Sequence, residues 1–130
     1  MKFKIKAPIL GFDQVKEVDL QESDELFAAI TDTDNSGLAW TLVNPYHLRE
    51  YSFDLTPQVQ ETLKINEKSN LLVYNVLVRG NATDDSVINF LAPIVFNKDE
   101  QIAAQLVLDG KQYPEFGVAQ KLSEFVPSAQ

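Results

Sequence analysis

The run Asp32-Thr-Asp-Asn-Ser-Gly37 is the stretch of this chain that most resembles a chemical site. Asp32 and Asp34, with the serine and glycine that follow, match positions 1, 3, 5 and 6 of a calcium-binding EF-hand loop. Position 12 of that loop should be a bidentate Glu, and here it is Val43. Residues 38–42 alternate between apolar and other residues, as in a strand, and no helix pattern flanks the loop. We therefore interpret the run as a polar turn between two strands.

His47 is the only histidine in the chain and the only other residue with an obvious chemical role. A histidine acts as a general base beside a nucleophile or an orienting acid, and no recognised nucleophile motif surrounds this one. The chain has no cysteine, which removes a disulfide framework and a thiolate zinc site. We expect no catalytic residue, metal or cofactor. A small-ligand or calcium-binding barrel, or an enzyme, with its site near Asp32, Asp34 and His47 is the alternative interpretation.

Length, net charge and hydrophobicity limit the number of domains and the kinds of partner. The chain has 130 residues and a net charge of −8. It is long enough to bury a core without disulfides or metals, so we expect one domain over residues 1–130. A nucleic-acid binder needs a basic stripe, whereas this acidic balance favours a basic protein partner. The N-terminus has no apolar core of a signal peptide and no run reaches the length of a membrane span, which predicts a soluble, cytoplasmic protein.

Two apolar runs predict the firmest strands, because their even positions, 88–96 and 102–108, are all apolar. Period two is the strand period, and the polar residues between the runs indicate a turn. If even positions face even positions, Phe96 pairs with Ile102 and the loop has three or five residues. Pro93 cannot donate to a ladder, which indicates a bulge or a sheet edge at that point.

Other patterns predict the remaining elements. Lysines alternate with apolar residues over 2–7, a half-buried strand suited to a sheet edge. Residues 71–78 are apolar on both faces, as in a central strand. Residues 23–30 fit a short helical turn or a strand, and Thr56-Pro57 fits the start of a short helix. Apolar spacing over 118–126 predicts an amphipathic C-terminal helix.

These elements predict an all-β fold, barrel-like or sandwich-like. It would contain about seven to nine short strands and two or three short helices, one of them at the C-terminus. The residues alone lead to an acidic β domain that works by binding.

Several segments together resemble the flagellar assembly factor FliW family, in the wording of its epsilonproteobacterial branch. They are Pro8-Ile-Leu-Gly-Phe12, Leu42-Val-Asn-Pro-Tyr46 with Tyr51 downstream, residues 87–97, and Gln105-Leu-Val-Leu-Asp109 with Tyr113-Pro114. Their order and spacing run over nearly the whole chain.

The resemblance implies a small barrel-like protein without enzymatic activity that binds flagellin in the cytoplasm. Family members also bind the translational regulator CsrA, an RNA-binding protein, without occupying its RNA site, and so relieve repression of flagellin translation. Accumulating flagellin takes the family member back and repression resumes. Competition of this kind responds to flagellin concentration near the dissociation constants.

We expect protein contacts at eight residues: Asn44, Tyr46, Tyr51, Phe53, Asp84, Asp85, Asn89 and Asn97. The first four lie in an irregular stretch, where aromatics are common binding anchors, although tyrosines also pack at barrel rims. The two acids are candidate rim charges for CsrA. The last two asparagines flank the Ala-Pro irregularity and either contact a partner or satisfy open backbone groups.

Overall fold

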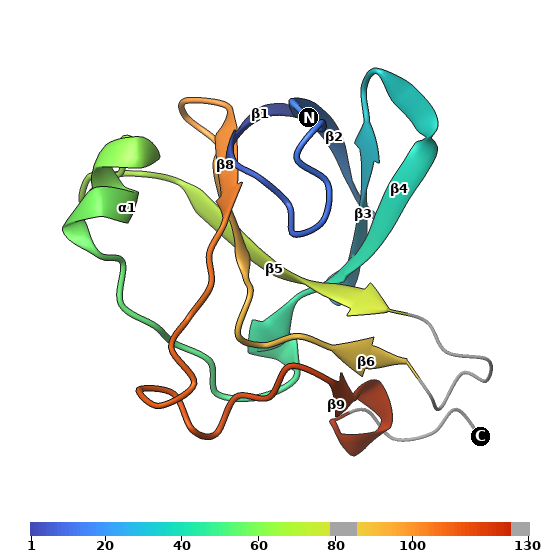
Figure 1. Ribbon diagram of the computed structural model, residues 1–130, viewed down its shortest axis with the longest axis vertical. Helices are drawn as coiled ribbons and strands as arrows, with labels where there is room; N and C mark the ends of the chain where they lie inside the picture. Colours follow the sequence, from blue (N-terminus) through green and yellow to red (C-terminus); the bar gives the residue numbers. More distant parts are fainter. Residues whose placement is uncertain (79–85, 126–130) are drawn as a thin grey trace.

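The computed structural model describes residues 1–78 and 86–125 (Figure 1). Its strands are β1 (Lys2–Ala7), β2 (Glu17–Glu22), β3 (Phe27–Asp32), β4 (Asn35–Val43), β5 (Leu71–Val78), β6 (Val87–Ile88), β7 (Ile94–Asn97), β8 (Ile102–Gln105) and β9 (Gln120–Lys121). Three short helical segments accompany them in the described part of the chain: the 3-10 turn η1 (Pro45–His47), the helix α1 (Pro57–Thr62) and the 3-10 turn η3 (Leu122–Glu124). None of the described helices has the length and apolar character needed to cross a membrane.

Seven of the strands close into a barrel. Their order is β4-β3-β2-β1-β8-β7-β5, and β5 pairs again with β4. The short β6 pairs with β5 outside this ring, and β9 pairs with β6. Closure gives each strand of the ring two neighbours, so none of these strands lies at the edge of the sheet. The predicted all-β, barrel-like class is confirmed.

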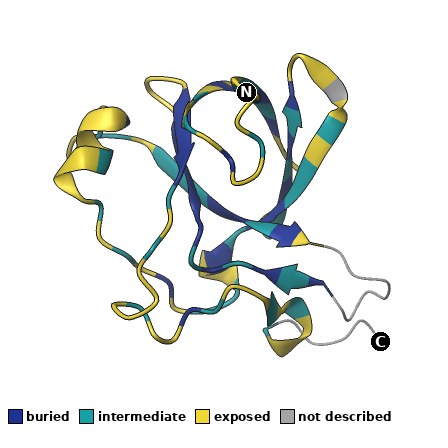
Figure 2. Cartoon of the chain, in the orientation of Figure 1, coloured by how far each residue is buried: buried dark blue, intermediate teal, exposed yellow. Residues whose placement is uncertain are grey.

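Large apolar side chains fill the barrel. The fully buried members of the main core include Phe3, Leu20, Ile30, Ile94 and Phe96. The rings of Phe3 and Phe96 meet edge to face with centroids 5.0 Å apart. Each such side chain contributes about 1.5–3 kcal/mol through its burial. Figure 2 shows β8 buried along its whole length.

The register of the β7–β8 hairpin differs from the prediction. Asn97 pairs with Ile102 and Phe96 with Ala103, so the loop has four residues rather than three or five. All residues of both strands are buried. The even-face rule assumes that one face is exposed, and here both faces are covered, so the alternation of apolar residues cannot select the register.

Turn chemistry selects this register instead. The side-chain oxygen of Asn97 accepts hydrogen bonds from the backbone N–H groups of Asp99 (3.0 Å) and Glu100 (3.3 Å). Gln101 completes the loop in the left-handed region with φ 56°. An Asx turn of this kind stabilises a tight reversal that starts at the asparagine itself.

Strand β1 is not at a sheet edge, as its lysines had predicted. It pairs with β2 on one side and with β8 on the other. Its lysines are exposed, and two of them lie opposite acids of β2: Lys2 faces Asp19 and Lys4 faces Glu17. Opposite charges on paired strands are favourable, so a lysine-rich outer face is compatible with a central strand.

Of two local predictions in the first half of the chain, the helical turn is wrong and the helix after Thr56 is confirmed. Residues 23–30 do not form a helical turn: the Asp24 carboxylate accepts from the N–H groups of Leu26 and Phe27, both at 2.8 Å, and strand β3 follows. The helix predicted after Thr56 is confirmed as α1, with the Thr56 hydroxyl accepting from Val59 N–H at 3.2 Å.

The central position predicted for β5 is confirmed, because it pairs with β4, β6 and β7. Between β6 and β7 the chain leaves the ladder over residues 89–93, which confirms the irregularity predicted at Pro93. The predicted polar turn at 79–86 lies almost entirely outside the described residues.

The amphipathic α-helix predicted over 118–126 is wrong for the described part of that segment. The chain there forms β9 and the 3-10 turn η3. Gln120 and Lys121 pair with β6, and the side chains of Leu122 and Phe125 pack on a neighbouring apolar cluster. A sheet edge that accepts a strand outweighed the helical spacing of the apolar residues.

Candidate protein-binding site

The predicted aromatic anchors follow strand β4. Asn44 caps η1, because its side-chain oxygen accepts from the N–H of Tyr46 at 3.0 Å. Its amide also donates to the carbonyl oxygen of Glu25 at 3.4 Å. Tyr46 is 52% exposed, and its ring meets the edge of the Tyr51 ring with centroids 5.9 Å apart. The cap therefore presents one tyrosine to solvent.

Tyr51, in contrast, is a buried part of the scaffold. Its hydroxyl donates to the carbonyl oxygen of Phe90 at 2.5 Å and accepts from the side-chain amide of Asn75 at 3.3 Å. Burial raises the pKa of this hydroxyl far above its ordinary value, so it stays protonated. Phe53 packs against the same ring at 5.6 Å. The structure thus brings Tyr46, Tyr51 and Phe53 together, with Tyr46 the most exposed.

A hollow of about 400 Å³ opens beside these aromatics. Its lining residues are Tyr46, Tyr51, Ser52, Phe53, Leu55, Leu71, Val73 and Val95. The lining holds no acid, lysine or arginine, so the hollow is suited to apolar side chains of a partner rather than to acid–base chemistry.

The other predicted contacts have different surroundings. Asn89 accepts from the N–H of Leu91 at 3.0 Å. Asn97 is fully buried, and its amide donates to the carbonyl oxygen of Leu63 at 2.7 Å. Both asparagines therefore hold backbone groups, and Asn97 lies at the hairpin turn. Asp84 and Asp85 lie outside the described residues.

Arg49 organises a cluster that the sequence did not reveal. Its guanidinium lies over the rings of Phe90, Phe116 and Phe125, at 5.1, 4.9 and 5.6 Å from their centroids. It also donates to the side-chain oxygen of Gln120 at 3.2 Å. Cation–π contacts and a forked donor suit arginine in particular. The only local signal in the sequence was an arginine two residues after the end of η1, because the partners of Arg49 lie far along the chain.

The residues of the alternative site do not converge. One carboxylate oxygen of Asp32 accepts from the N–H of Asp34 at 3.0 Å, as expected of a turn, and β4 begins at Asn35. His47 is exposed on η1. Over residues 1–78 and 86–125, no three His, Asp or Glu side chains gather in a way that could hold a metal ion. The structure supports the interpretation of this run as a turn between strands.

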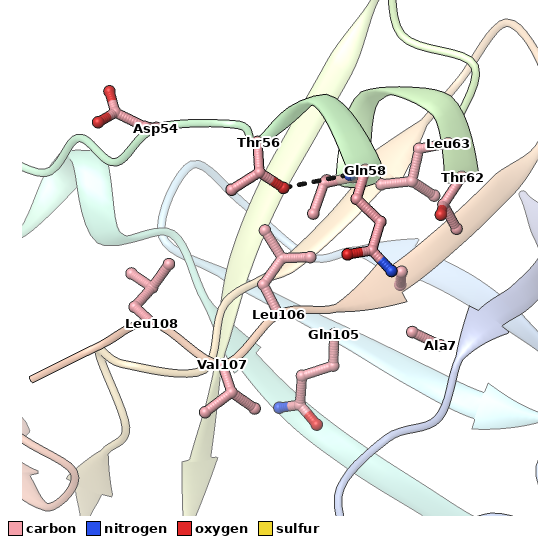
Figure 3. Close-up of a pocket in the computed structure, with 12 residues that line it drawn as sticks. Ala7, Asp54, Thr56, Gln58, Thr62, Leu63, Gln105, Leu106, Val107 and Leu108 are labelled. Atoms are coloured by element: carbon pink, nitrogen blue, oxygen red, sulfur yellow. Dashed lines mark hydrogen bonds between the residues drawn. The ribbon is translucent and has the colours of Figure 1, made fainter.

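A second groove lies between α1 and the segment after β8 (Figure 3). Its volume is about 320 Å³, and Leu63, Leu106 and Leu108 are among its lining residues. An adjoining hollow of about 480 Å³ continues it towards Asp109 and Tyr113. The two share Asp54, Thr56, Val107 and Leu108, so they form one elongated surface groove.

The fold and these surfaces define a class of protein: a small closed β-barrel with apolar grooves on its outside. The FliW protein family matches residues 1–118 of the chain. The flagellar assembly factor FliW 1 of Wolinella succinogenes is 48% identical over 126 residues, which cover 97% of this chain and 98% of that protein. The chain belongs to the FliW family.

Further relatives agree with this assignment. The flagellar assembly factor FliW of Sulfurimonas denitrificans is 41% identical, over 97% of this chain and 98% of that protein. That of Helicobacter pylori strain G27 is 42% identical, over 97% and 95%. These organisms confirm the epsilonproteobacterial branch. A crystal structure of the flagellar assembly factor FliW covers 98% of this chain and 88% of its own, with a TM-score of 0.83 at 22% identity, which supports the fold.

Proposed function

We propose that the protein is a cytoplasmic flagellar assembly factor without enzymatic activity, which binds flagellin and antagonises CsrA. Exchange between these two partners would couple flagellin synthesis to flagellin export. The observation that carries the proposal is family membership over the whole barrel, with a relative named flagellar assembly factor that is 48% identical over 97% of the chain. The identities of the two partners follow from the resemblance described above.

The charge of the protein supports a basic partner. The chain has 19 acidic and 11 basic residues. In the described part of the chain, only two ion pairs form: the amino group of Met1 with Asp19 at 3.0 Å, and Lys64 with Glu100 at 3.9 Å. Most of the described carboxylates are therefore not neutralised by an ion pair within the protein. A protein that holds RNA, such as CsrA, carries basic charge, and complementary charge speeds encounter.

The hollow beside Tyr46 supports binding of an amphipathic segment. The terminal segments of flagellin form amphipathic helices, and grooves with an aromatic anchor accept the apolar face of such helices. Tyr46 is exposed, and its ring meets the ring of Tyr51 edge to face. An aromatic side chain that is already ordered loses little entropy on binding. We propose that the partner contacts Asn44, Tyr46 and Phe53, and that the buried Tyr51, which was also predicted as a contact, supports the ring of Tyr46 from inside.

Gel filtration of the protein with flagellin, and separately with CsrA, tests the proposal. We expect co-elution with each at micromolar concentration. Tyr46→Ala should weaken at least one complex by about 10-fold, a loss of about 1.4 kcal/mol. His47→Ala, on the same exposed turn, is the matched control and should bind as the wild type does. If the protein co-elutes with neither partner, the proposal is wrong.

Two further measurements test the mechanism. In a translation reporter repressed by CsrA, added protein should restore synthesis, and added flagellin should reverse that effect. Raised salt should slow association with CsrA more than association with flagellin, because salt screens charge steering. Equal salt dependence of the two rates would contradict the role given to charge.

A further inference from the structure

Strand β8 has an open edge beyond the end of β1. The two strands pair in parallel, and the last paired residues are Ala7 and Ala104. Pro8 follows Ala7, and Ile9 pairs locally with Phe12, so the backbone leaves the ladder at this point. The one hydrogen bond that the turn keeps to this segment goes to a side chain: the N–H of Leu10 donates to the Gln105 side-chain oxygen at 2.7 Å. The position that β1 would occupy beside residues 105–108 is therefore not filled by β1. The groove between this segment and α1 lies there (Figure 3).

The segment after β8 remains extended and keeps one side hydrogen-bonded. The N–H of Leu106 donates to the carbonyl oxygen of Pro93 at 2.8 Å, and that of Leu108 donates to Leu91 at 2.7 Å. On the opposite side, the N–H of Lys4 donates to the carbonyl oxygen of Gln101 at 3.0 Å. Backbone groups alternate along a strand, so odd-numbered residues face the side of β1 and even-numbered residues face β7.

Val107 therefore directs its N–H and C=O towards the side that β1 has left. Neither group has a hydrogen-bond partner among the described residues. Val107 is 70% exposed. A strand edge with unpaired backbone groups is a template for the addition of another strand.

The walls of the groove specify the chemistry of an added strand. Leu106 and Leu108 point towards the segment that leads into α1, whereas Val107 points the other way (Figure 3). Two carboxylates, Asp54 and Asp109, line the groove, and its lining contains no lysine or arginine. The groove thus combines an apolar floor with negative charge towards one end. Its complement is a segment with apolar residues at alternate positions followed by a lysine or arginine.

We propose that the edge formed by residues 105–109 binds an extended peptide segment of a protein partner by strand addition. The N–H and C=O of Val107 would pair with the backbone of the added segment. Its alternate apolar side chains would pack beside Leu106 and Leu108, and a basic side chain would reach Asp54 or Asp109. This proposal does not depend on the identity of the partners proposed above.

The test uses the full protein and the synthetic peptide acetyl-Thr-Val-Thr-Ile-Thr-Lys-Thr-amide, whose valine, isoleucine and lysine share one face. Amide exchange and chemical shifts are followed by NMR. We expect shift changes confined to the groove and at least about 10-fold slower exchange of the Val107 amide at saturation, because that amide gains a partner. Unprotected Val107 at saturation, or no binding at millimolar peptide, would overturn the proposal.

Variants separate backbone pairing from simple apolar contact. In an added strand, the N–H facing Val107 belongs to the isoleucine if the peptide runs parallel to residues 105–109, and to the preceding threonine if it runs antiparallel. N-methylation of one of these two peptide residues should therefore weaken binding at least about 10-fold. Val107→Pro, which removes an N–H that has no described internal partner, should do the same. Val107→Thr retains the N–H and should bind as the wild type does. If both methylated peptides bind as tightly as the parent peptide, strand addition is wrong.

Two controls address the charge and the occupant. The double variant Asp54→Asn, Asp109→Asn should weaken the lysine peptide by about 3-fold to 10-fold and leave its norleucine analogue unaffected. Equal effects on both peptides would remove the requirement for a basic residue. If protection of Val107 in the free protein rises with protein concentration, the occupant is a second copy of the chain and the proposed partner is wrong.

Discussion

The hydroxyl of Tyr51 donates a buried hydrogen bond of 2.5 Å to the carbonyl oxygen of Phe90, across 39 residues of sequence. This contact joins the loop after η1 to the place where the chain leaves the ladder between β6 and β7. The side-chain amide of Asn75, on β5, donates to the same hydroxyl at 3.3 Å. One phenol therefore holds together the surface that presents Tyr46 and the irregularity at residues 89–93.

Removal of this hydroxyl should destabilise the barrel. Tyr51→Phe leaves the carbonyl oxygen of Phe90 buried without its donor, which costs about 1–3 kcal/mol. The free energy of unfolding, measured with denaturant, should fall by that amount. Tyr46→Phe makes the same chemical change at an exposed ring and should stay within about 0.5 kcal/mol of the wild type. Equal losses in the two variants would contradict the role given to the buried hydroxyl.

The cluster around Arg49 should control the stability of the segment 113–125. Arg49→Lys retains the charge but loses the planar stacking on three rings and the geometry of the bond to Gln120. We expect a loss of about 1–2 kcal/mol and faster amide exchange in that segment. Glu50→Gln, at the neighbouring exposed position, is the control. Unchanged exchange at Phe116 and Leu122 would show that Arg49 does not hold the segment.

Loss of the amide donor of Asn97 should lower the free energy of unfolding. Asn97→Asp keeps the oxygen that organises the hairpin turn but replaces the donor to Leu63 with a buried carboxylate. We expect a loss of about 3 kcal/mol or more near neutral pH. The loss should shrink in acid, because protonation removes the buried charge and restores a donor. Asn66→Asp, an exposed turn residue that accepts from Lys68 N–H, should change stability little.

The turn before β3 should make a pH-dependent contribution to the free energy of unfolding. Hydrogen bonds from the N–H groups of Phe27 and Leu26 hold the pKa of Asp24 below its ordinary 3.8. A lowered folded-state pKa stabilises the protein above the unfolded pKa, and this contribution disappears as the pH falls through the folded value. The difference in unfolding free energy between wild type and Asp24→Ala should stay constant from about pH 7 to about pH 5 and shrink below 3.8.

The matched control for this prediction is Glu25→Ala, at the next exposed position. Its effect on the unfolding free energy should be small at every pH. A difference between wild type and Asp24→Ala that does not change with pH would show that the carboxylate charge plays no part in the turn.

The structural features that the sequence predicted correctly depend on interactions between residues close together in the chain. Thr56-Pro57 starts a helix because the threonine side chain and the fixed proline φ satisfy helix requirements without tertiary help. The run at Asp32 forms a turn because its carboxylate bonds to a backbone N–H two residues on. Alternation and apolar content located most of the strands for the same reason, since they depend on nearest neighbours.

The features that differ from the sequence predictions all depend on contacts with residues far away in the chain. The hairpin register escaped prediction because both faces of β7 and β8 are buried, so the apolar pattern carries no preference. The segment 118–125 became a strand and a 3-10 turn because β6 offers an edge and Arg49 offers a stacking surface. The helical spacing of the apolar residues carries no information about β6 or Arg49.

The sequence by itself determined an acidic, all-β chain of the FliW family, with its turns, its short helix and its central strand. Only the tertiary structure decided that Tyr51 is buried while Tyr46 is exposed, and that Asn97 serves a turn. The open edge at Val107 also belongs to this second group. Burial and backbone pairing are properties of residues far apart in sequence, so they appear only once the barrel has closed.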